Sequence, residues 1–133
     1  MIGMTMDLNK LVAASKYAME HAYAPYSGFK VGATVLGESE RIYSGCNVEN
    51  ASYGLSICAE RTAILKAISE GEKKIRAVAI ACSSGKPAFP CGACRQVMAE
   101  FAPKDGAMGV YLVSDEGVEE YTLTDLLPHA FKL

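Results

Sequence analysis

Three cysteines and one glutamate stand at spacings that suit the chemistry of a metal site. Cys58 and Glu60 are separated by one alanine, and Cys91 and Cys94 form a Cys-x-x-Cys motif. The spacing of that motif places both of its sulfurs on one side of a first helical turn. Residues two apart lie about 200° apart around a helix, so Cys58 and Glu60 can serve one centre only beyond the N-terminus of their helix. Three thiolates and a carboxylate that converge in this way predict a zinc site with one position left for water.

Glu60 suits proton transfer better than metal ligation, because a carboxylate beside a metal-bound water can accept its proton. Zinc with three thiolates carries a net negative charge, which weakens it as a Lewis acid unless a neighbour neutralises part of that charge. Arg61 follows Glu60 directly and can donate a hydrogen bond to a ligating sulfur. Gln96 and Arg95, just after Cys94, are further candidates for such a contact, and Arg95 could equally be a surface charge.

Other uses of the five cysteines compete with this interpretation. The Cys-x-x-Cys motif alone could be a dithiol redox pair, although that leaves Cys58 and Glu60 without a role. A structural zinc site with four sulfur ligands would recruit Cys46 or Cys82, for which buried filler on strands is the favoured interpretation. An odd cysteine count without an export signal fits a disulfide framework badly and indicates a reducing compartment. A zinc-stabilised binding module without catalytic activity also stays open, and Glu60 distinguishes it from an enzyme.

The elements that must position these residues follow from apolar periodicity and turn signals. Helices are expected over residues 5–22, 58–70 and from 91 to just before 103, with a short helical turn over 124–127. Strands are expected over residues 29–36, 41–48, 75–81, 108–113 and 118–123. Thr5 or Asp7 can cap the first helix. This order predicts an α/β fold, a three-layer α/β/α sandwich with one mixed sheet of about five strands, in a single domain over residues 1–133.

Length and charge exclude several classes of protein. The chain has 133 residues, with 13 Lys and Arg against 15 Asp and Glu and a net charge of −2. A protein that binds polyanions usually presents a basic stripe, so no nucleic-acid partner is expected. No apolar run approaches the roughly 18 residues of a spanning helix, and the first residues do not have the pattern of a signal peptide. A cytoplasmic protein without a membrane partner is therefore expected.

The two cysteine motifs and three further segments carry a family resemblance. The segments are CAERTA at 58–63, PCGACRQV at 90–97, PYSGFKVGA at 25–33, GCNVENASY at 45–53 and LLPHAF at 126–131. Together they closely resemble the small, homotetrameric cytidine deaminases over nearly the whole chain, and no motif position departs from the pattern in a way that would disable the chemistry. The resemblance implies a cytidine-deaminase fold and one Zn²⁺ per chain, held by Cys58, Cys91 and Cys94.

The resemblance also implies a reaction. Glu60 would transfer protons during the hydrolytic deamination of cytidine and deoxycytidine to uridine and deoxyuridine plus ammonia, in pyrimidine salvage. Two proton transfers by one group require a pKa near neutrality, as burial of Glu60 would produce. A related alternative is a deaminase of aminonucleoside antibiotics such as blasticidin S, which shares the two cysteine motifs.

The resemblance assigns the substrate contacts as well. Asn47 and Glu49, two residues apart at a strand end, would hydrogen-bond the ribose 3′-hydroxyl from one face. Phe29 would lie against the pyrimidine ring. Tyr53 and Phe131 would reach the active site of a neighbouring subunit, so that a homotetramer shares its sites. The implied substrate contacts are Asn47, Glu49, Phe29, Ala59, Tyr53 and Phe131.

Overall fold

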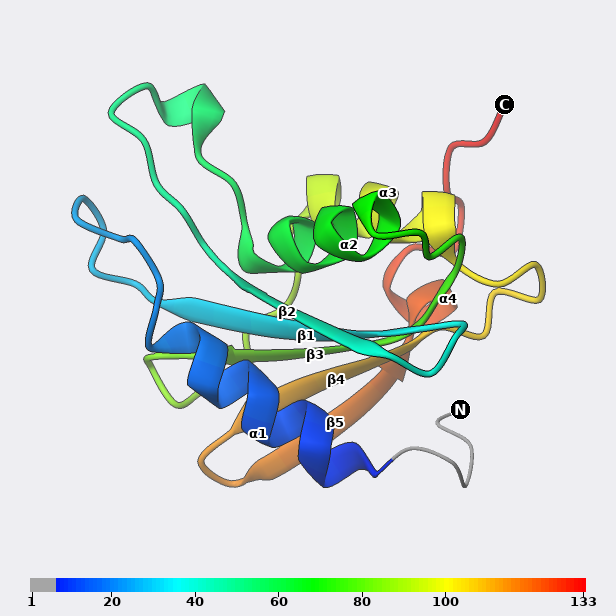
Figure 1. The fold of residues 1–133 in the computed structure, drawn as a ribbon, viewed down its shortest axis with the longest axis horizontal. Coiled ribbons are helices and arrows are strands. Elements are labelled where there is room, and N and C mark those ends of the chain that lie inside the picture. Colours follow the sequence, from blue (N-terminus) through cyan, green and yellow to red (C-terminus); the bar gives the residue numbers. More distant parts are fainter. Residues whose placement is uncertain (1–6) are drawn as a thin grey trace.

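Five strands form one mixed sheet with helices on both of its faces (Figure 1). The computed structural model describes residues 7–133. The strands are β1 (Val31–Gly37), β2 (Ile42–Cys46), β3 (Ile75–Cys82), β4 (Gly109–Ser114) and β5 (Gly117–Thr122), in the spatial order β2-β1-β3-β4-β5. Strands β3 and β4 pair in parallel, and the other neighbouring strands pair antiparallel. The predicted sandwich around a mixed five-stranded sheet is confirmed.

The helices form two layers. Helix α1 (Leu8–Met19) lies on one face of the sheet, while α2 (Ala59–Ser69) and α3 (Gly92–Phe101) lie on the other (Figure 1). Helix α4 (Leu123–Leu126) follows β5 directly, and a single 3₁₀ turn, η1 (Tyr53–Leu55), stands in the connection between β2 and α2. Within residues 7–133, no helix has the length and apolar character needed to cross a membrane.

The central strand β3 is buried on both faces, as its nearly unbroken apolar run predicts. Val78 and Ile80 belong to the larger core cluster, together with buried side chains of α2 and α3. Ala77 and Ala79 belong to a smaller cluster with Leu11 of α1. The sheet thereby provides a rigid base on which the N-terminal ends of α2 and α3 are held.

Two glycines let the helices approach the sheet closely. A Cβ atom at Gly32 of β1 would clash with backbone atoms of Ser15 and Met19 in α1. A Cβ atom at Gly45 of β2 would lie 2.7 Å from the backbone N of Ala63 in α2. Because packed interiors avoid contacts this short, both positions require a residue without a side chain.

The first helix is shorter than expected at both ends. It begins at Leu8, and Asp7 is its N-cap, with Oδ1 accepting the N–H of Asn9 at 2.9 Å. The alternative cap, Thr5, lies outside the described residues. The helix ends at Met19 rather than at residue 22, because the chain then turns to pair Tyr23 with the segment after β2.

Other elements also differ from expectation. Strand β2 ends at Cys46 rather than at residue 48, since Val48 forms isolated bridges with Tyr23 and Ile57. Helix α4 begins one residue early, where Thr122 caps it by accepting the N–H of Asp125. The turn η1 was not expected, because residues 53–55 lack any helical periodicity.

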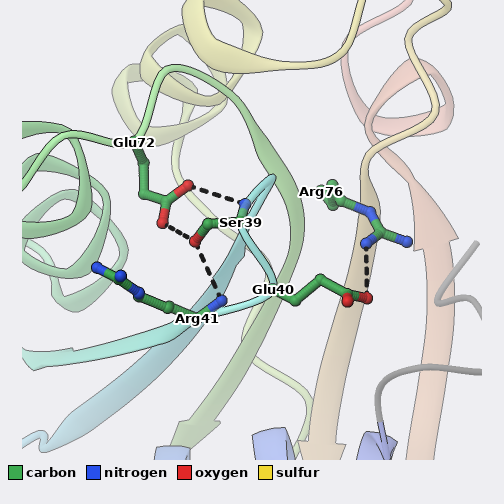
Figure 2. A network of polar contacts seen from close by, with 5 residues as sticks. All are labelled: Ser39, Glu40, Arg41, Glu72 and Arg76. Carbon is green, nitrogen blue, oxygen red and sulfur yellow. Dashed lines mark hydrogen bonds and ion pairs between the residues drawn. The ribbon is translucent and has the colours of Figure 1, made fainter.

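A buried carboxylate ties the turn between β1 and β2 to the segment after α2. Glu72 accepts hydrogen bonds from the N–H of Ser39 at 3.2 Å and from Ser39 Oγ (Figure 2). It also accepts the hydroxyl of Tyr43 at 2.8 Å. Burial favours the neutral acid, but these hydrogen bonds and the nearby Arg41 outweigh it and hold the pKa of Glu72 below its usual value. This cluster fixes the C-terminal end of α2, opposite to the end that begins at Cys58.

Candidate active site

Three cysteine sulfurs meet at the N-terminal ends of two helices. The Sγ of Cys91 lies 4.0 Å from that of Cys58 and 3.5 Å from that of Cys94, and all three lie within 4.8 Å of one another. Cys58 is the N-cap residue of α2, Cys91 is the N-cap residue of α3, and Cys94 stands in the first turn of α3. The structure thus brings together the three thiols whose spacing suggested a common centre beyond two helix starts.

The cluster fits a zinc ion in donor type and spacing. Zinc–sulfur bonds of about 2.3 Å at tetrahedral angles place neighbouring sulfurs about 3.8 Å apart. The observed separations of 3.5 and 4.0 Å lie on either side of that value. Three protein donors leave a fourth position free, which distinguishes a catalytic zinc site from a closed structural one.

The other two cysteines lie outside this cluster. Cys46 is half-buried at the end of β2. Cys82 is buried at the end of β3, where its Sγ lies 3.1 Å from Ser84 Oγ and 3.2 Å from the carbonyl O of Lys86. Neither belongs to the metal-binding group found among residues 7–133, so the described residues do not form a four-cysteine site.

The clustered thiols and Arg61 perturb one another electrostatically. The pKa of Cys58 falls to about 5, first because Cys94 hydrogen-bonds to it and further because Arg61 lies beside its sulfur. The Nη2 of Arg61 donates to Cys58 Sγ at 3.4 Å. The pKa of Cys94 rises, since the neighbouring Cys58 thiolate and burial both disfavour a second negative charge. Arg61 therefore supplies positive charge directly at a sulfur of the cluster.

Glu60 is buried beside the sulfurs, with 5% of its surface exposed, in the first turn of α2. Burial raises its pKa to about 7, and the negative charge on Cys58 adds to the rise. A carboxyl group with a pKa near neutrality can accept a proton and release it again within one reaction.

Asn47 holds the entry to β1. Its Oδ1 accepts the N–H of Val31 at 2.8 Å, and its Nδ2 donates to the carbonyl O of Phe29, also at 2.8 Å. The residue lies just beyond the end of β2, the strand on which it was expected. One N–H of its amide stays available, because the Nδ2 group carries two.

Glu49 holds the turn that precedes Phe29. Its carboxylate accepts the N–H groups of Tyr26 and Ser27 at 3.0 and 3.1 Å, and also the hydroxyl of Ser27. The hydrogen bond from the Ser27 hydroxyl is the main reason that the pKa of Glu49 lies below its usual value. The Ser27 hydroxyl in turn accepts the N–H of Phe29 at 3.0 Å. Ser27 was not singled out from the sequence, since a serine in a turn is ordinary and only the fold brings it to Glu49.

Gln96 and Arg95 contact backbone carbonyls rather than sulfurs, contrary to expectation. The Nε2 of Gln96 donates to the carbonyl O of Phe131 at 3.0 Å. Arg95 donates from Nε to Pro90 O and from Nη1 to Leu126 O, both at 2.7 Å. Both side chains point from α3 toward the C-terminal segment, because they lie on a different side of the helix from Cys94.

The remaining expected substrate contacts fall into two groups. Phe29, Tyr53 and Phe131 are exposed in the single chain, with 42%, 92% and 69% of their surface accessible. Ala59 is fully buried in the larger core cluster. Its side chain therefore serves packing, and only its backbone N–H, in the unpaired first turn of α2, could face a ligand.

Comparison with known proteins agrees with this geometry. A family model described as the cytidine and deoxycytidylate deaminase zinc-binding region matches residues 5–110. A cytidine deaminase of Sporosarcina psychrophila is 52% identical over 127 residues, which cover 95% of this chain and 92% of the relative. One from Halalkalibacterium halodurans is 49% identical over 127 residues, with 95% of each chain covered.

A solved structure shares the fold. The crystal structure of cytidine deaminase from Burkholderia pseudomallei superposes with a TM-score of 0.88 at 45% identity, covering 95% of this chain and 100% of that one. The family match spans the cysteine cluster, Glu60, Asn47 and Glu49, and the relatives match nearly end to end. The chain therefore belongs to the cytidine and deoxycytidylate deaminases, a family of zinc-binding enzymes.

Proposed function

We propose that the protein hydrolyses cytidine and deoxycytidine to uridine and deoxyuridine plus ammonia, in pyrimidine salvage within the cytoplasm, with the whole chain acting as one deaminase domain. The observation that carries the proposal is the buried Glu60 beside the cluster of Cys58, Cys91 and Cys94. A proton-transferring carboxyl at a three-thiol centre suits hydrolysis at a carbon that bears an amino group.

Each residue of the centre has a role in this proposal. Cys58, Cys91 and Cys94 hold zinc, which when bound acts as a Lewis acid that lowers the pKa of a coordinated water. Arg61 offsets the negative charge of the Cys58 thiolate. Glu60 accepts a proton from the attacking water and delivers it to ring N3.

Glu60 then completes the reaction. It takes the proton of the hydroxyl newly added at C4 and passes it to the amino group. The C4–N bond breaks, ammonia leaves, and C4 keeps the oxygen as a carbonyl. Water is the only co-reactant, so the reaction balances without an oxidant or a reductant.

Asn47, Glu49 and Phe29 select a nucleoside. The free N–H of Asn47 can donate to a sugar hydroxyl, and the Glu49 carboxylate can accept from the same hydroxyl. A free base would leave these polar groups unpaired, which lowers its rate strongly. Phe29, on the loop that these two residues hold, lies against the pyrimidine ring.

The proposed active form is a homotetramer with shared sites. Tyr53 and Phe131 are large apolar side chains that a single chain leaves exposed. Contact with a neighbouring subunit would bury them and place them at its active site.

The proposal is tested by the loss of cytidine absorbance with purified, zinc-loaded protein. Deoxycytidine, cytosine, CMP and blasticidin S are run in parallel. Rapid turnover of the two nucleosides, with slow turnover of cytosine and CMP, is expected. Failure to deaminate cytidine would refute the proposal, and faster turnover of blasticidin S would favour the antibiotic deaminase instead. A zinc-bound protein inactive on every compound would favour the non-catalytic module.

A further inference from the structure

Arg95 makes two of the short side-chain hydrogen bonds near the cysteine cluster, and the proposed function uses neither. Its Nε donates to the carbonyl O of Pro90 at 2.7 Å, and its Nη1 donates to the carbonyl O of Leu126 at 2.7 Å. Pro90 immediately precedes Cys91, and Leu126 is the last residue of α4. The guanidinium of Arg95 thus joins the entry of the cysteine loop to Leu126, which stands 31 residues after Arg95 in the chain.

The backbone of Arg95 acts on the same loop. Its N–H donates to the carbonyl O of Cys91 at 3.0 Å, which closes the first turn of α3. Arg95 therefore engages two consecutive carbonyls, those of Pro90 and Cys91, one through its side chain and one through its backbone. These bonds fix the peptide that joins Pro90 to Cys91, and hence the direction in which the Cys91 side chain leaves the backbone. Cys91 is also the exposed member of the cluster, so neighbouring side chains constrain it least.

The geometry of the guanidinium suits this role. Nε and Nη1 are held in one plane at a fixed separation, so they can satisfy two separate carbonyls at once. A lysine ammonium is a single point of charge on a flexible stem and cannot reproduce both contacts. Pro90 is buried, and Arg95 and Leu126 are partly buried, so these hydrogen bonds are partly shielded from water.

A neighbouring contact supports the same connection. Gln96 donates to the carbonyl O of Phe131 at 3.0 Å. Arg95 and Gln96, which follow Cys94 directly, therefore bind successive parts of the C-terminal segment, at Leu126 and Phe131.

We propose that Arg95 is a positioning residue that holds the Cys91–Cys94 loop in its metal-binding shape by joining the Pro90 and Leu126 carbonyls. The inference rests on the proposed function in taking Cys91 and Cys94 as zinc ligands. Arg95 acts through the loop backbone and touches neither metal nor substrate. Residues that orient metal ligands without binding the metal typically change its affinity by about 10- to 100-fold when they are removed.

The test measures zinc release into a chromogenic chelator from wild type, Arg95→Ala and Arg95→Lys. Release is expected to be about tenfold faster or more from both variants. In the cobalt-substituted proteins, the sulfur-to-cobalt charge-transfer band should shift or weaken in the same two variants. Wild-type release by Arg95→Lys would show that charge alone suffices and would overturn the proposal.

Two controls separate positioning from loss of stability. Leu8→Ala removes apolar contacts on the opposite face of the sheet, and Arg76→Ala removes an exposed guanidinium paired with Glu40. Both controls should release zinc at the wild-type rate, even where Leu8→Ala lowers the Tm as much as Arg95→Ala does. If zinc release followed the Tm in all variants, Arg95 would be merely structural. A wild type that binds zinc but does not deaminate cytidine would refute the proposed function while leaving the comparison of release rates intact.

Discussion

Glu60 and Arg61 are consecutive residues of α2, and both interact with Cys58. Burial pushes Glu60 toward its neutral form, while the Cys58 sulfur binds the cation of Arg61. The raised pKa of Glu60 and the contact of Arg61 with Cys58 could be predicted from the sequence, because both involve residues within three positions of Cys58. The contacts of Ser27 with Glu49 and of Arg95 with Leu126 could not, because 22 and 31 residues separate the partners and only the fold joins them.

Ser27→Ala tests the loop that carries Phe29. The substitution removes the hydroxyl that joins the Glu49 carboxylate to the N–H of Phe29, so the loop that carries Phe29 loses one connection. We expect kcat/KM for cytidine to fall about fivefold, equivalent to about 1 kcal/mol, mainly through KM. Ser114→Ala is the matched control, since the Ser114 hydroxyl makes similar contacts within the β4–β5 turn, with Glu116 and Gly117, and its loss should leave KM unchanged. A fall in kcat alone would contradict this role for Ser27.

Glu72→Gln tests the carboxylate beyond the C-terminal end of α2. The pKa of Glu72 is lower in the folded protein than its ordinary value, so its charge stabilises the fold above the unfolded pKa, about 4.3. That stabilisation is lost as pH falls through the folded pKa. We expect urea unfolding to show wild type more stable than Glu72→Gln at pH 7, with the difference shrinking at pH 3. An equal difference at both pH values would contradict the charge argument. Glu40→Gln, which breaks an exposed ion pair with Arg76 (Figure 2), should cost less than about 1 kcal/mol.

At the scale of elements, the type and order of the helices and strands followed from apolar periodicity. The differences arose where distant backbone competed with local preference. Tyr23 and Val48 pair with each other, which ends both α1 and β2 earlier than their side-chain patterns suggest. The starts of α2 and α3 were predicted closely, and each helix begins just after a cysteine at its N-cap position. The candidate site benefits from this, because the cysteine cluster depends on those two starts.

Gly45→Ala tests whether the close packing of α2 against β2 positions the cysteine cluster. The new Cβ would lie 2.7 Å from the backbone N of Ala63, so α2 must move away from β2. We expect the stability to fall by about 1–3 kcal/mol and kcat to fall as well, since Cys58 and Glu60 move with the helix. Gly32→Ala is the matched control, because it displaces α1 on the opposite face. Its stability should fall while kcat, measured below its Tm, stays near wild type; equal losses of kcat in both would contradict the argument.

At the scale of the whole molecule, the chain leaves two large aromatic side chains of the family motifs exposed. Tyr53 and Phe131 have few contacts to hold them within one chain, yet they stand in segments of the family resemblance. No pattern within one chain determines where such residues pack in an assembly. Their roles therefore rest on the resemblance and on the proposed homotetramer.

Mixing subunits tests the shared site. Phe131→Ala should lower kcat/KM in an intact tetramer, since each site would lack an aromatic contact from its neighbour. When Phe131→Ala and Glu60→Gln chains are co-expressed, hybrid tetramers should regain activity. In them a Glu60→Gln chain supplies Phe131 to a partner that retains its carboxylate. Activity no higher than the average of the two parent variants would show that sites are not shared.

The measurement that bears most directly on the catalytic centre is the zinc content and cytidine turnover of Glu60→Gln. The substitution keeps the size of a side chain that is 5% exposed and leaves the three sulfurs in place. We expect about one zinc per chain and a Tm near wild type, with kcat reduced by about 10²- to 10⁴-fold because the proton transfers at water, N3 and the amino group lose their carrier. Turnover near the wild-type rate in a zinc-loaded Glu60→Gln protein would contradict the proposed chemistry.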